Sequence, residues 1–412
     1  MIESRSKRPG ARKKPLAPKR RPQRSAIDGV AEREEAAAEA PQRGRIDISF
    51  FFLIIVLQTI GLIMLFSASY VTALHENGNS LYYVIRQSLF VIVGLIAMVV
   101  ASYIDYHFWR KLKWLIYLGG IALMALALIY DSPNSSGARR WVYLPTQSHA
   151  LISFQPSEIM KFAVAILCAH LIAANYKQMN KLKFGLYPFA IVLIPIAGLM
   201  VLQRHMSGLI LMLLIIFTMM FVGGSKIRWF VVLGGAVVGL AVLFLMYKGF
   251  DYIQIRLSNW LDPLSGDLRG SKWQTAQSLY AIGSGGLMGV GLGNSTQKFL
   301  YLSEPQNDFI FAIVCEELGF VGALVIILLF VLLIYSGVSI AMRAPDKFGC
   351  MLVIGLVAQI GWQALLNIAV VTNSIPNTGI SLPFFSAGGT ALTMQLAQMG
   401  VILNVSRYCH RD

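Results

Sequence analysis

Apolar stretches of membrane-spanning length recur along most of this chain, and they restrict its possible folds more than any other feature. A helix needs about 20 apolar residues to cross the hydrocarbon layer of a bilayer. Ten stretches approach or exceed that length, at residues 48–70, 84–101, 114–130, 157–173, 186–202, 206–222, 229–247, 309–341, 350–372 and 390–406. We therefore predict an all-α polytopic membrane protein with ten transmembrane helices.

The overall composition supports a membrane protein. Hydrophobic residues make up 56% of the 412-residue chain and charged residues 13%, with a mean hydropathy of +0.63. A soluble protein of this composition would lack the polar residues to cover its surface. The fifth and sixth stretches are separated by Gln203, Arg204 and His205 alone, and we predict a hairpin there, because one tilted helix could not absorb their combined length.

A polar tail at residues 1–46 precedes the membrane domain, which we place at residues 47–412. The tail has 13 Lys and Arg against 6 acidic residues, a net charge of +7, and is too polar to form a core, so we expect disorder. It could bind anionic lipid of the inner leaflet, or serve as a topogenic and solubilising tail. Nucleic-acid binding is not expected.

Basic residues predict the orientation, because Lys and Arg are enriched in cytoplasmic loops. The tail places the N-terminus in the cytoplasm, and an even number of spans places the C-terminus there too. The short loops assigned to that side are basic: Arg110, Lys111 and Lys113; Lys177, Lys181 and Lys183; Lys226 and Arg228; Arg343 and Lys347. Residues 248–308 form a large extracytoplasmic loop between helices 7 and 8; its five basic residues are weak counter-evidence, since long loops cross largely regardless of charge.

Three outer loops, 131–156, 248–308 and 373–389, are rich in Gly, Pro, Ser or Asn. Irregular backbone at membrane depth is tolerated where it is buried in protein or lines a wet cavity, so we expect these loops to wall one outward-facing cleft. The glycine run at 283–293 lacks the lysine and the preceding strand of a phosphate-binding loop. A tight re-entrant turn, in which missing side chains allow close packing, is the better interpretation.

Asp308 is the leading candidate for chemistry, because it lies where the longest polar loop meets an apolar helix. The competing interpretation is a helix N-cap. Lys298, Glu304, Glu316 and Glu317 surround it in sequence, and charges inside membranes are costly and often functional. Glu316 falls on roughly the same helical face, and we expect it to line a polar shaft below the acid.

Other charged residues extend this candidate site. Glu158 and Lys161 are three residues apart at a helix start marked by Pro156; they could form an internal ion pair or face the cleft. Arg139 and Arg140, next to Trp141, could bind phosphate oxygens or anchor the interface. We predict that the residues binding an anionic substrate are Arg139, Arg140, Glu158, Lys161, Lys272, Lys298 and Glu304.

Five sequence blocks resemble one known family. The blocks RRW, FQPSEIMK, QSLYAIGSGGLMGVGLG, DFIFAIVCEELG and TGISLPFFSAGGTAL occur in that order and are similar to those of the SEDS family of FtsW, RodA and SpoVE proteins, across about residues 48–407. The resemblance implies ten helices and a peptidoglycan glycosyltransferase that polymerises lipid II at the outer face of the bacterial cytoplasmic membrane. It also implies a class B penicillin-binding protein, a transpeptidase, as partner, with other divisome or elongation proteins.

The resemblance assigns the essential acid of the family to Asp308, although Asn307 replaces the usual Thr and Ser303 a usual Pro. Ala387 replaces a usual Tyr, and Arg204-His205 replaces a usual Pro-Asp pair, so roles of those groups do not transfer. Asp308 would then act as general base on the acceptor hydroxyl. Arg139, Arg140, Lys272 or Lys298 would stabilise the leaving pyrophosphate; a divalent cation, Mg²⁺ or Mn²⁺, could do the same, and no other cofactor is expected.

Two other functions remain open at this point. A lipid II flippase would place charges at the bilayer midplane on broken helices and would show an internal repeat; we find no clear repeat, and the polar groups gather in the outer loops. A non-catalytic scaffold of a wall-building complex would tolerate loss of Asp308. Division, elongation and sporulation also remain open, with the long tail and the FFSAGGT block favouring division or sporulation.

Overall fold

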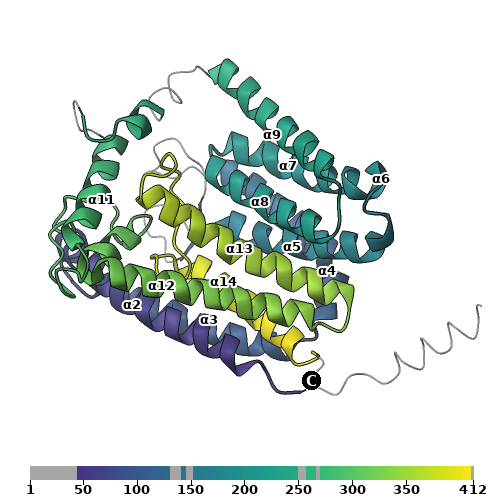
Figure 1. Cartoon of the computed structure of the whole chain (residues 1–412), viewed down its shortest axis with the longest axis horizontal. Coiled ribbons are helices and arrows are strands. Elements are labelled where there is room, and N and C mark those ends of the chain that lie inside the picture. Colours follow the sequence, from purple (N-terminus) through teal and green to yellow (C-terminus); the bar gives the residue numbers. More distant parts are fainter. Residues whose placement is uncertain (1–43, 130–140, 145–151, 249–256, 266–269, 410–412) are drawn as a thin grey trace, which may run out of the picture. The chain divides into compact units, whose positions relative to one another are not determined.

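The structure, a computed structural model, describes residues 44–129, 141–144, 152–248, 257–265 and 270–409 (Figure 1). Residues 1–43 of the predicted tail, and Arg139 and Arg140, lie outside this range. The named elements are α2 Ile48–Asn77, α3 Tyr82–Tyr103, α4 Tyr106–Ile129, β1 Val142–Leu144, β2 Ile152–Phe154, α5 Pro156–Asn175, η1 Tyr176–Gln178, α6 Leu182–Gly185, α7 Tyr187–Leu202, α8 Met206–Val222, α9 Ile227–Lys248, α11 Ser271–Gly285, α12 Ile310–Met342, α13 Lys347–Val371 and α14 Gly389–Ser406.

The helices match the ten predicted stretches in order, and they make the chain a polytopic helical membrane protein. Within the described residues, seven helical segments are long and apolar enough to cross a membrane: α2, α3, α4, α5 with η1, α6 with α7, α12 and α13. The apolar segments of α8 and α9, Met206–Val222 and Ile227–Ala236, are shorter than those of the seven, and α14 has 18 residues. Membrane crossing by these three helices, and hence the number ten, stays a prediction.

The predicted hairpin between α7 and α8 is confirmed. Helix α7 ends at Leu202 and α8 begins at Met206, with Arg204 in a left-handed conformation (φ 55°) at the turn. The buried Gln203 donates from Nε2 to the carbonyl of Met124 at 2.7 Å. This bond ties the turn to α4.

One end of the bundle gathers the starts of α2, α4 and α13 and the ends of α12 and α14; we call it the basic end. The Gly44 N–H donates to the carbonyl of Arg407 at 2.9 Å, and Arg343 lies 3.2 Å from the Asp47 carboxylate. The guanidinium of Arg110 stacks over Phe348. Basic residues from several of the loops predicted to be cytoplasmic therefore lie at one end.

Asp346 is the most connected acid of the basic end. It caps α13 by accepting from the Gly349 N–H, and it accepts from the Tyr106 hydroxyl at 2.6 Å. Burial by itself would raise the pKa of the Asp346 carboxyl, but hydrogen bonds from His107, Tyr106 and the Gly349 backbone hold that pKa below its usual range. The carboxylate therefore joins α13 to α4.

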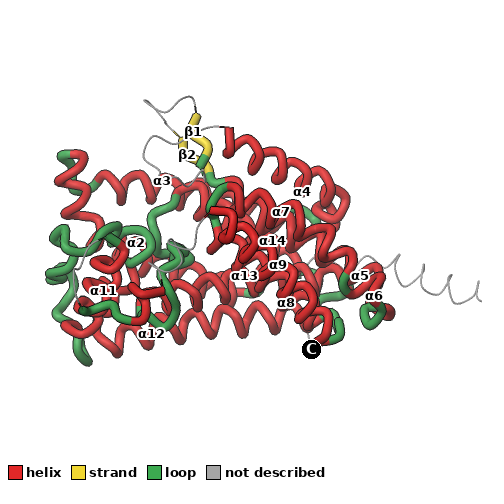
Figure 2. The backbone as a smooth tube through the Cα atoms, turned by 90° about the horizontal axis from the view of Figure 1, so that it is seen from above, coloured by secondary structure: helices red, strands yellow, loops and turns green. Residues whose placement is uncertain are grey.

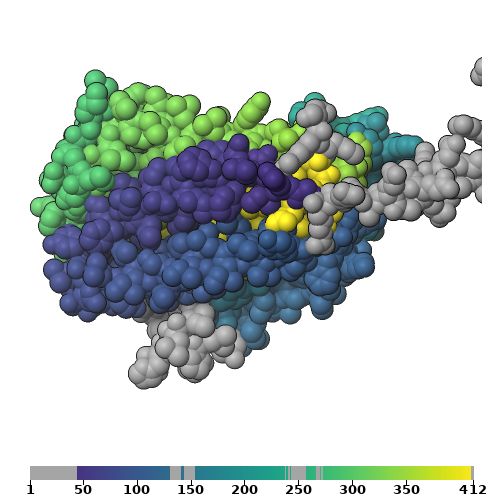
Figure 3. Space-filling model, turned by 90° about the horizontal axis from the view of Figure 1, so that it is seen from below, coloured from purple at the N-terminus to yellow at the C-terminus, as the bar shows by residue number. Residues whose placement is uncertain are grey.

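Helices α5 and α13 form the centre of the bundle. In each, 67% of the most apolar 18-residue window is buried, against 22% in α3 and α4. Helix α13 packs against α5, α8 and α12, and Figure 1 shows it running between them. Figure 3 shows α2, in purple, between the blue α3 and the green α12.

Helix α14 packs closely along α3. A side chain at Gly400 would meet the carbonyl of Met98 at 2.2 Å, so this approach requires a glycine. The contact places the start of α14 beside the start of α3, at the end opposite the basic end.

The loops predicted to be extracytoplasmic contain regular structure that the sequence did not indicate. Strands β1 and β2 form a short antiparallel ribbon in which Val142 pairs with Phe154 and Leu144 with Ile152 (Figure 2). The loop at 248–308 contains helix α11. The prediction of an all-α fold is thus correct for the helical bundle and wrong for this ribbon, whose sequence is interrupted by polar and Pro residues.

Candidate active site

Helix α12 is interrupted where the glycine run packs against it. Its 33 residues would extend about 50 Å at 1.5 Å per residue, well beyond the hydrocarbon layer of about 30 Å. The helix breaks at Gly319 (φ 68°, ψ −170°). At this break, Val290 N–H and Gly291 N–H donate to the carbonyls of Glu316 and Glu317, each at 3.0 Å.

The glycine run is needed for this packing. A side chain at Gly289 would come within 2.2 Å of the Glu317 carbonyl oxygen. Phe320 N–H donates in return to the carbonyl of Gly286 at 2.9 Å. The predicted close packing is confirmed; the re-entrant position in the membrane stays a prediction.

Glu317, just before the break in the sequence, belongs to a polar cluster buried inside the protein. Its carboxylate lies 3.0 Å from Lys298 Nζ, with side-chain exposures of 0% and 2%. The Ser67 hydroxyl of α2 donates to the same carboxylate at 2.6 Å. Lys298 also donates to the Gly293 carbonyl at 2.6 Å. The lysine is therefore saturated by partners and does not lie on a surface that a substrate could reach.

Glu316 is sealed in the same way. It is fully buried, and it accepts from the Thr296 N–H at 2.8 Å, from the Thr296 hydroxyl at 2.9 Å and from the Ser295 hydroxyl. The expectation that Glu316 lines a shaft below Asp308 is wrong. Its helical face points to the 295–297 turn, which the sequence alone does not place. We call Glu316, Glu317, Lys298, Ser295, Thr296 and Ser67 the sealed cluster.

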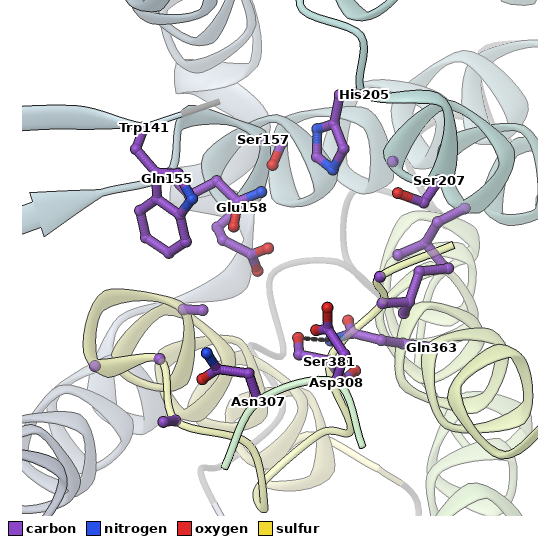
Figure 4. Close-up of a pocket in the computed structure, with 18 of the residues that line it drawn as sticks. Trp141, Gln155, Ser157, Glu158, His205, Ser207, Asn307, Asp308, Gln363 and Ser381 are labelled. Carbon is purple, nitrogen blue, oxygen red and sulfur yellow. Dashed lines mark hydrogen bonds between the residues drawn. The ribbon is translucent and has the colours of Figure 1, made fainter. Parts of the chain in front are cut away.

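An open cavity of about 460 Å³ lies at the end of the bundle opposite the basic end (Figure 4). Its walls come from all three predicted loops, from the starts of α3, α5, α8 and α14, and from Gln363 of α13. The lining residues are Tyr83, Arg86, Gln87, Trp141, Gln155, Ser157, Glu158, Lys161, His205, Ser207, Gly208, Leu211, Met212, Glu304, Asn307, Asp308, Gln363, Gly379, Ile380, Ser381, Ala387, Gly388, Gly389 and Ala391. The described parts of those loops thus line one cavity, as expected; that the cavity faces outward stays a prediction.

Asp308 lies half-buried on the wall of this cavity. It is not the N-cap of α12: the helix begins at Ile310, and Phe309 holds the N-cap position without a side-chain cap bond. The carboxylate lies against the backbone of Gly379, where a side chain would come within 3.1 Å of Asp308 Oδ2. In Figure 4 the carboxylates of Asp308 and Glu158 point into the same space from opposite walls.

Glu158 and Lys161 form the predicted pair and also line the cavity. Lys161 Nζ lies 2.7 Å from Glu158 Oε2, and both residues are at least nine-tenths buried. Lys161 also donates to Gln363 Oε1 at 3.1 Å, and Gln363 Nε2 donates to the Ser381 carbonyl at 3.1 Å. A chain of polar groups therefore connects α5, α13 and the 373–389 loop along one wall.

Of the other predicted substrate-binding residues that the structure describes, one lines the cavity and two do not. Glu304 lines the cavity and accepts from Asn307 Nδ2 at 2.6 Å. Lys272 bonds to the Ser265 carbonyl and does not line the cavity, and Lys298 lies in the sealed cluster. Neither lysine therefore lies on the described wall of the site, because carbonyl and carboxylate oxygens of the protein bind the two ammonium groups elsewhere. Arg139 and Arg140 lie outside the described residues.

The start of α3 contributes cavity residues that the sequence reasoning missed. Arg86 is half-buried on the wall, next to Gln87, whose Nε2 donates to the Ser386 carbonyl at 3.2 Å. Tyr83 lies one turn earlier and bonds to Glu76 at 2.8 Å. A single arginine inside an apolar stretch often marks a functional residue, and this criterion would have identified Arg86 from the sequence.

The sequence and fold match known proteins. Residues 47–411 match the family of cell cycle proteins that comprises FtsW, RodA and SpoVE. Stage V sporulation protein E of Bacillus subtilis is 39% identical over 363 residues, which cover 88% of this chain and 97% of that protein. The probable peptidoglycan glycosyltransferase FtsW of Geobacter sp. (strain M18) is 34% identical, covering 87% of this chain and 96% of that protein.

Two solved structures share the fold. A chain from a peptidoglycan synthase complex, described for its coordination of polymerization and crosslinking, superposes with a TM-score of 0.73 and 24% identity, covering 89% of this chain and 99% of that one. The rod shape determining protein RodA of Thermus thermophilus superposes with a TM-score of 0.64 and 24% identity, covering 89% and 98%. At this identity the likeness establishes the fold.

Proposed function

Because this chain belongs to the FtsW, RodA and SpoVE family of cell cycle proteins, we propose that it is an inverting peptidoglycan glycosyltransferase that polymerises lipid II. The family relationship to proteins named peptidoglycan glycosyltransferases supports this reaction. The single structural observation that carries the proposal is Asp308, half-buried on the wall of an open cavity that Lys161 and Arg86 also line. The cavity is lined by three carboxylates and two cations, and since Lys161 is paired with Glu158, Asp308 and Arg86 are the acid and the cation that suit proton removal beside a phosphate.

Asp308 accepts the proton of the acceptor sugar 4-hydroxyl as that oxygen attacks the anomeric carbon of the donor glycan. The new carbon–oxygen bond forms as the bond to the lipid pyrophosphate breaks, and the leaving group takes the bonding electrons. A base needs only hydrogen-bond reach of the hydroxyl. Holding two lipid-anchored sugars in line supplies much of the remaining acceleration.

The departing pyrophosphate gathers negative charge, which fixed cations stabilise. Arg86 and Lys161 line the described cavity, and Lys161 is already paired with Glu158 at 2.7 Å, so Arg86 is the leading described cation for this role. Arg139 and Arg140 precede Trp141, which also lines it, and we retain them as pyrophosphate ligands. The described residues contain no group of three His, Cys, Asp or Glu side chains that could hold a metal.

A divalent cation remains compatible with this site. Mg²⁺ commonly takes one or two carboxylates together with substrate phosphates, and Asp308 or Glu304 could supply the carboxylate. When bound, such an ion would neutralise charge on the leaving pyrophosphate.

We place the cavity on the outer side of the bacterial cytoplasmic membrane, with ten spans and both termini in the cytoplasm. The clustering of Arg110, Arg343, Lys347 and Arg407 at the opposite end supports this orientation. A class B penicillin-binding protein is the proposed partner, since a chain with this fold occurs in a peptidoglycan synthase complex. The sporulation and FtsW relatives favour a role in division or in sporulation.

The substitution Asp308→Asn tests the proposal. General base catalysis contributes about 10²–10⁴-fold, so the rate at which purified protein with its partner converts lipid II into glycan strands should fall by that factor. Asp262→Asn is the control, because Asp262 lies in the same long loop, is exposed, and does not line the cavity. Unchanged polymerisation by Asp308→Asn would remove Asp308 as the base. If lipid II moves across vesicles while neither protein forms strands, the chain is a transporter.

A further inference from the structure

Three consecutive backbone carbonyls, those of Gln306, Asn307 and Asp308, are bound by donors from a distant part of the chain. The Ala387 N–H donates to the Gln306 carbonyl at 2.8 Å. The Ser386 hydroxyl donates to the Asn307 carbonyl at 2.6 Å. Asn367 Nδ2 donates to the Asp308 carbonyl at 2.7 Å. We call these three donors and their acceptors the carbonyl clamp.

The carbonyl clamp is needed because residues 306–308 form turns ahead of α12 and belong to no regular helix or strand. Carbonyls in such a segment must find partners outside a helical or sheet ladder. The partners come from α13 and from the 373–389 loop, so they fix the segment to other elements. We infer that Asn367 and Ser386 are positioning residues that hold Asp308 in place for proton transfer.

Asn367 has the stronger role, because its side chain joins two segments at once. It is fully buried, and its Nδ2 donates to the Ile380 carbonyl at 2.6 Å as well as to the Asp308 carbonyl. Both partners are acceptors, which fixes the amide orientation. Its Oδ1 accepts no hydrogen bond within the described structure. The residue is therefore used as a donor, and an isosteric carboxylate at this position would repel both carbonyls.

Ser386 forms a second hydrogen-bonded connection to the same segment. Its hydroxyl accepts from the Leu382 N–H at 2.7 Å while it donates to the Asn307 carbonyl. The accepted bond directs the hydroxyl proton toward Asn307. Neither Ser386 nor Asn367 lines the cavity of about 460 Å³, and both are buried. Ser386 lines a smaller adjoining pocket that shares Glu158 and Gln363 with the cavity. Both residues therefore act on Asp308 through the backbone of its segment.

The inference rests on the proposed role of Asp308 as general base, and its test separates the two. The variants are Asn367→Asp and Ser386→Ala, made in the full chain and assayed with the partner synthase for kcat and KM on lipid II. We expect kcat to fall roughly 10–100-fold, because displacement of a catalytic group by about 1 Å can cost 10²-fold, while KM stays within about twofold. Ser386→Thr, which keeps the hydroxyl, should recover most of the rate lost in Ser386→Ala.

The matched control is Asn404→Asp at the basic end. Asn404 is also a fully buried amide, and it also joins two segments, donating to the Ser102 carbonyl at 2.9 Å and accepting from the Tyr106 N–H at 2.9 Å. Asn404→Asp should lower the thermal unfolding temperature without lowering kcat per folded molecule. An equal fall in kcat for Asn404→Asp and Asn367→Asp would reduce the clamp to a general effect on stability and overturn the inference.

A double substitution distinguishes positioning from a separate function. If Asn367 acts through Asp308, then Asn367→Asp should add little to the loss in Asp308→Asn, measured as residual strand formation over long incubations. Losses that multiply would show that Asn367 acts elsewhere. Full activity of a folded Asn367→Asp variant would also overturn the inference. Full activity of Asp308→Asn alone would instead overturn the proposed function.

Discussion

Asp308 and the pair Glu316 and Glu317 come from one short segment of sequence, yet the fold gives them opposite environments. Asp308 faces an open cavity, and its backbone carbonyl is bound by another element. Glu316 and Glu317 are at most 1% exposed and are surrounded by hydroxyl, amide and ammonium donors of the sealed cluster. The same carboxylate chemistry is thus placed on a cavity wall in one case and inside a buried cluster that joins elements of the fold in the other.

The difference shows that the environment of each carboxylate follows from its tertiary contacts and not from its position in the sequence. A buried carboxylate must be paired, because transfer from water is costly unless ionic and hydrogen-bonding partners replace hydration. In the sealed cluster the partners bond directly to the carboxylate oxygens. At Asp308 the carbonyl clamp binds the backbone of the segment, and the side chain lies half-buried on the cavity wall.

The largest effect on stability should come from breaking the ion pair of the sealed cluster. Lys298→Met removes the ammonium group and leaves the Glu317 carboxylate buried without its counter-charge, which typically costs about 3–5 kcal/mol. We expect a large fall in the thermal unfolding temperature of the detergent-solubilised protein. The double variant Lys298→Met with Glu317→Gln should recover much of that loss. A Lys298→Met protein as stable as the parent would contradict the structural role.

A smaller loss is expected for Glu316→Gln. The amide group of glutamine would face N–H and hydroxyl donors at Thr296 and Ser295 that need an acceptor, and an unsatisfied buried group costs about 1–3 kcal/mol. Thermal unfolding should therefore shift downward, while strand formation per folded molecule stays close to that of the parent. A selective loss of kcat without loss of stability would place Glu316 with Asp308 in the catalytic machinery.

Gly379→Ala tests how closely the Asp308 carboxylate must be held. The glycine has a φ of 66°, and an added Cβ would lie 3.1 Å from Asp308 Oδ2. Backbone strain of about 1–2 kcal/mol should accompany a fall in kcat with little change in KM. Gly78→Ala is the control, since Gly78 has the same φ of 66° with nothing near its Cβ. Equal kcat values in the two variants would argue against a close fit at the carboxylate.

The smallest effect concerns pH and the basic end. Because the pKa of Asp346 is lowered in the folded protein, this carboxylate stabilises the fold above the unfolded-state pKa of about 3.9 and loses that contribution as the pH falls through the lower folded-state value. Asp346→Asn should therefore make stability less dependent on pH below about 4. Its side chain is 34% exposed, so solvent screening keeps the effect small. Unfolding temperatures should be measured across that pH range. If they change with pH as steeply in the variant as in the parent, this contribution is excluded.

The sequence alone predicted those features that depend on local pattern. Runs of apolar residues located the helices, and the i, i+3 spacing of Glu158 and Lys161 placed both on one face, where they pair at 2.7 Å. The motif-based choice of Asp308 led to a cavity residue. These successes share a cause, because helical periodicity and the membrane length requirement are properties of short stretches of chain.

Only the tertiary structure decided which charges face the cavity. Lys298 and Glu316 are close to Asp308 in sequence but lie in the sealed cluster, whereas Arg86 and Gly379 are distant in sequence and line the cavity. The pairing of the 306–308 carbonyls with Asn367 and Ser386 likewise depends on contacts between distant segments. Sequence determined which segments form apolar helices, because hydrophobicity acts locally. The fold determined the environment of each charge, because that environment is built by partners from elsewhere in the chain.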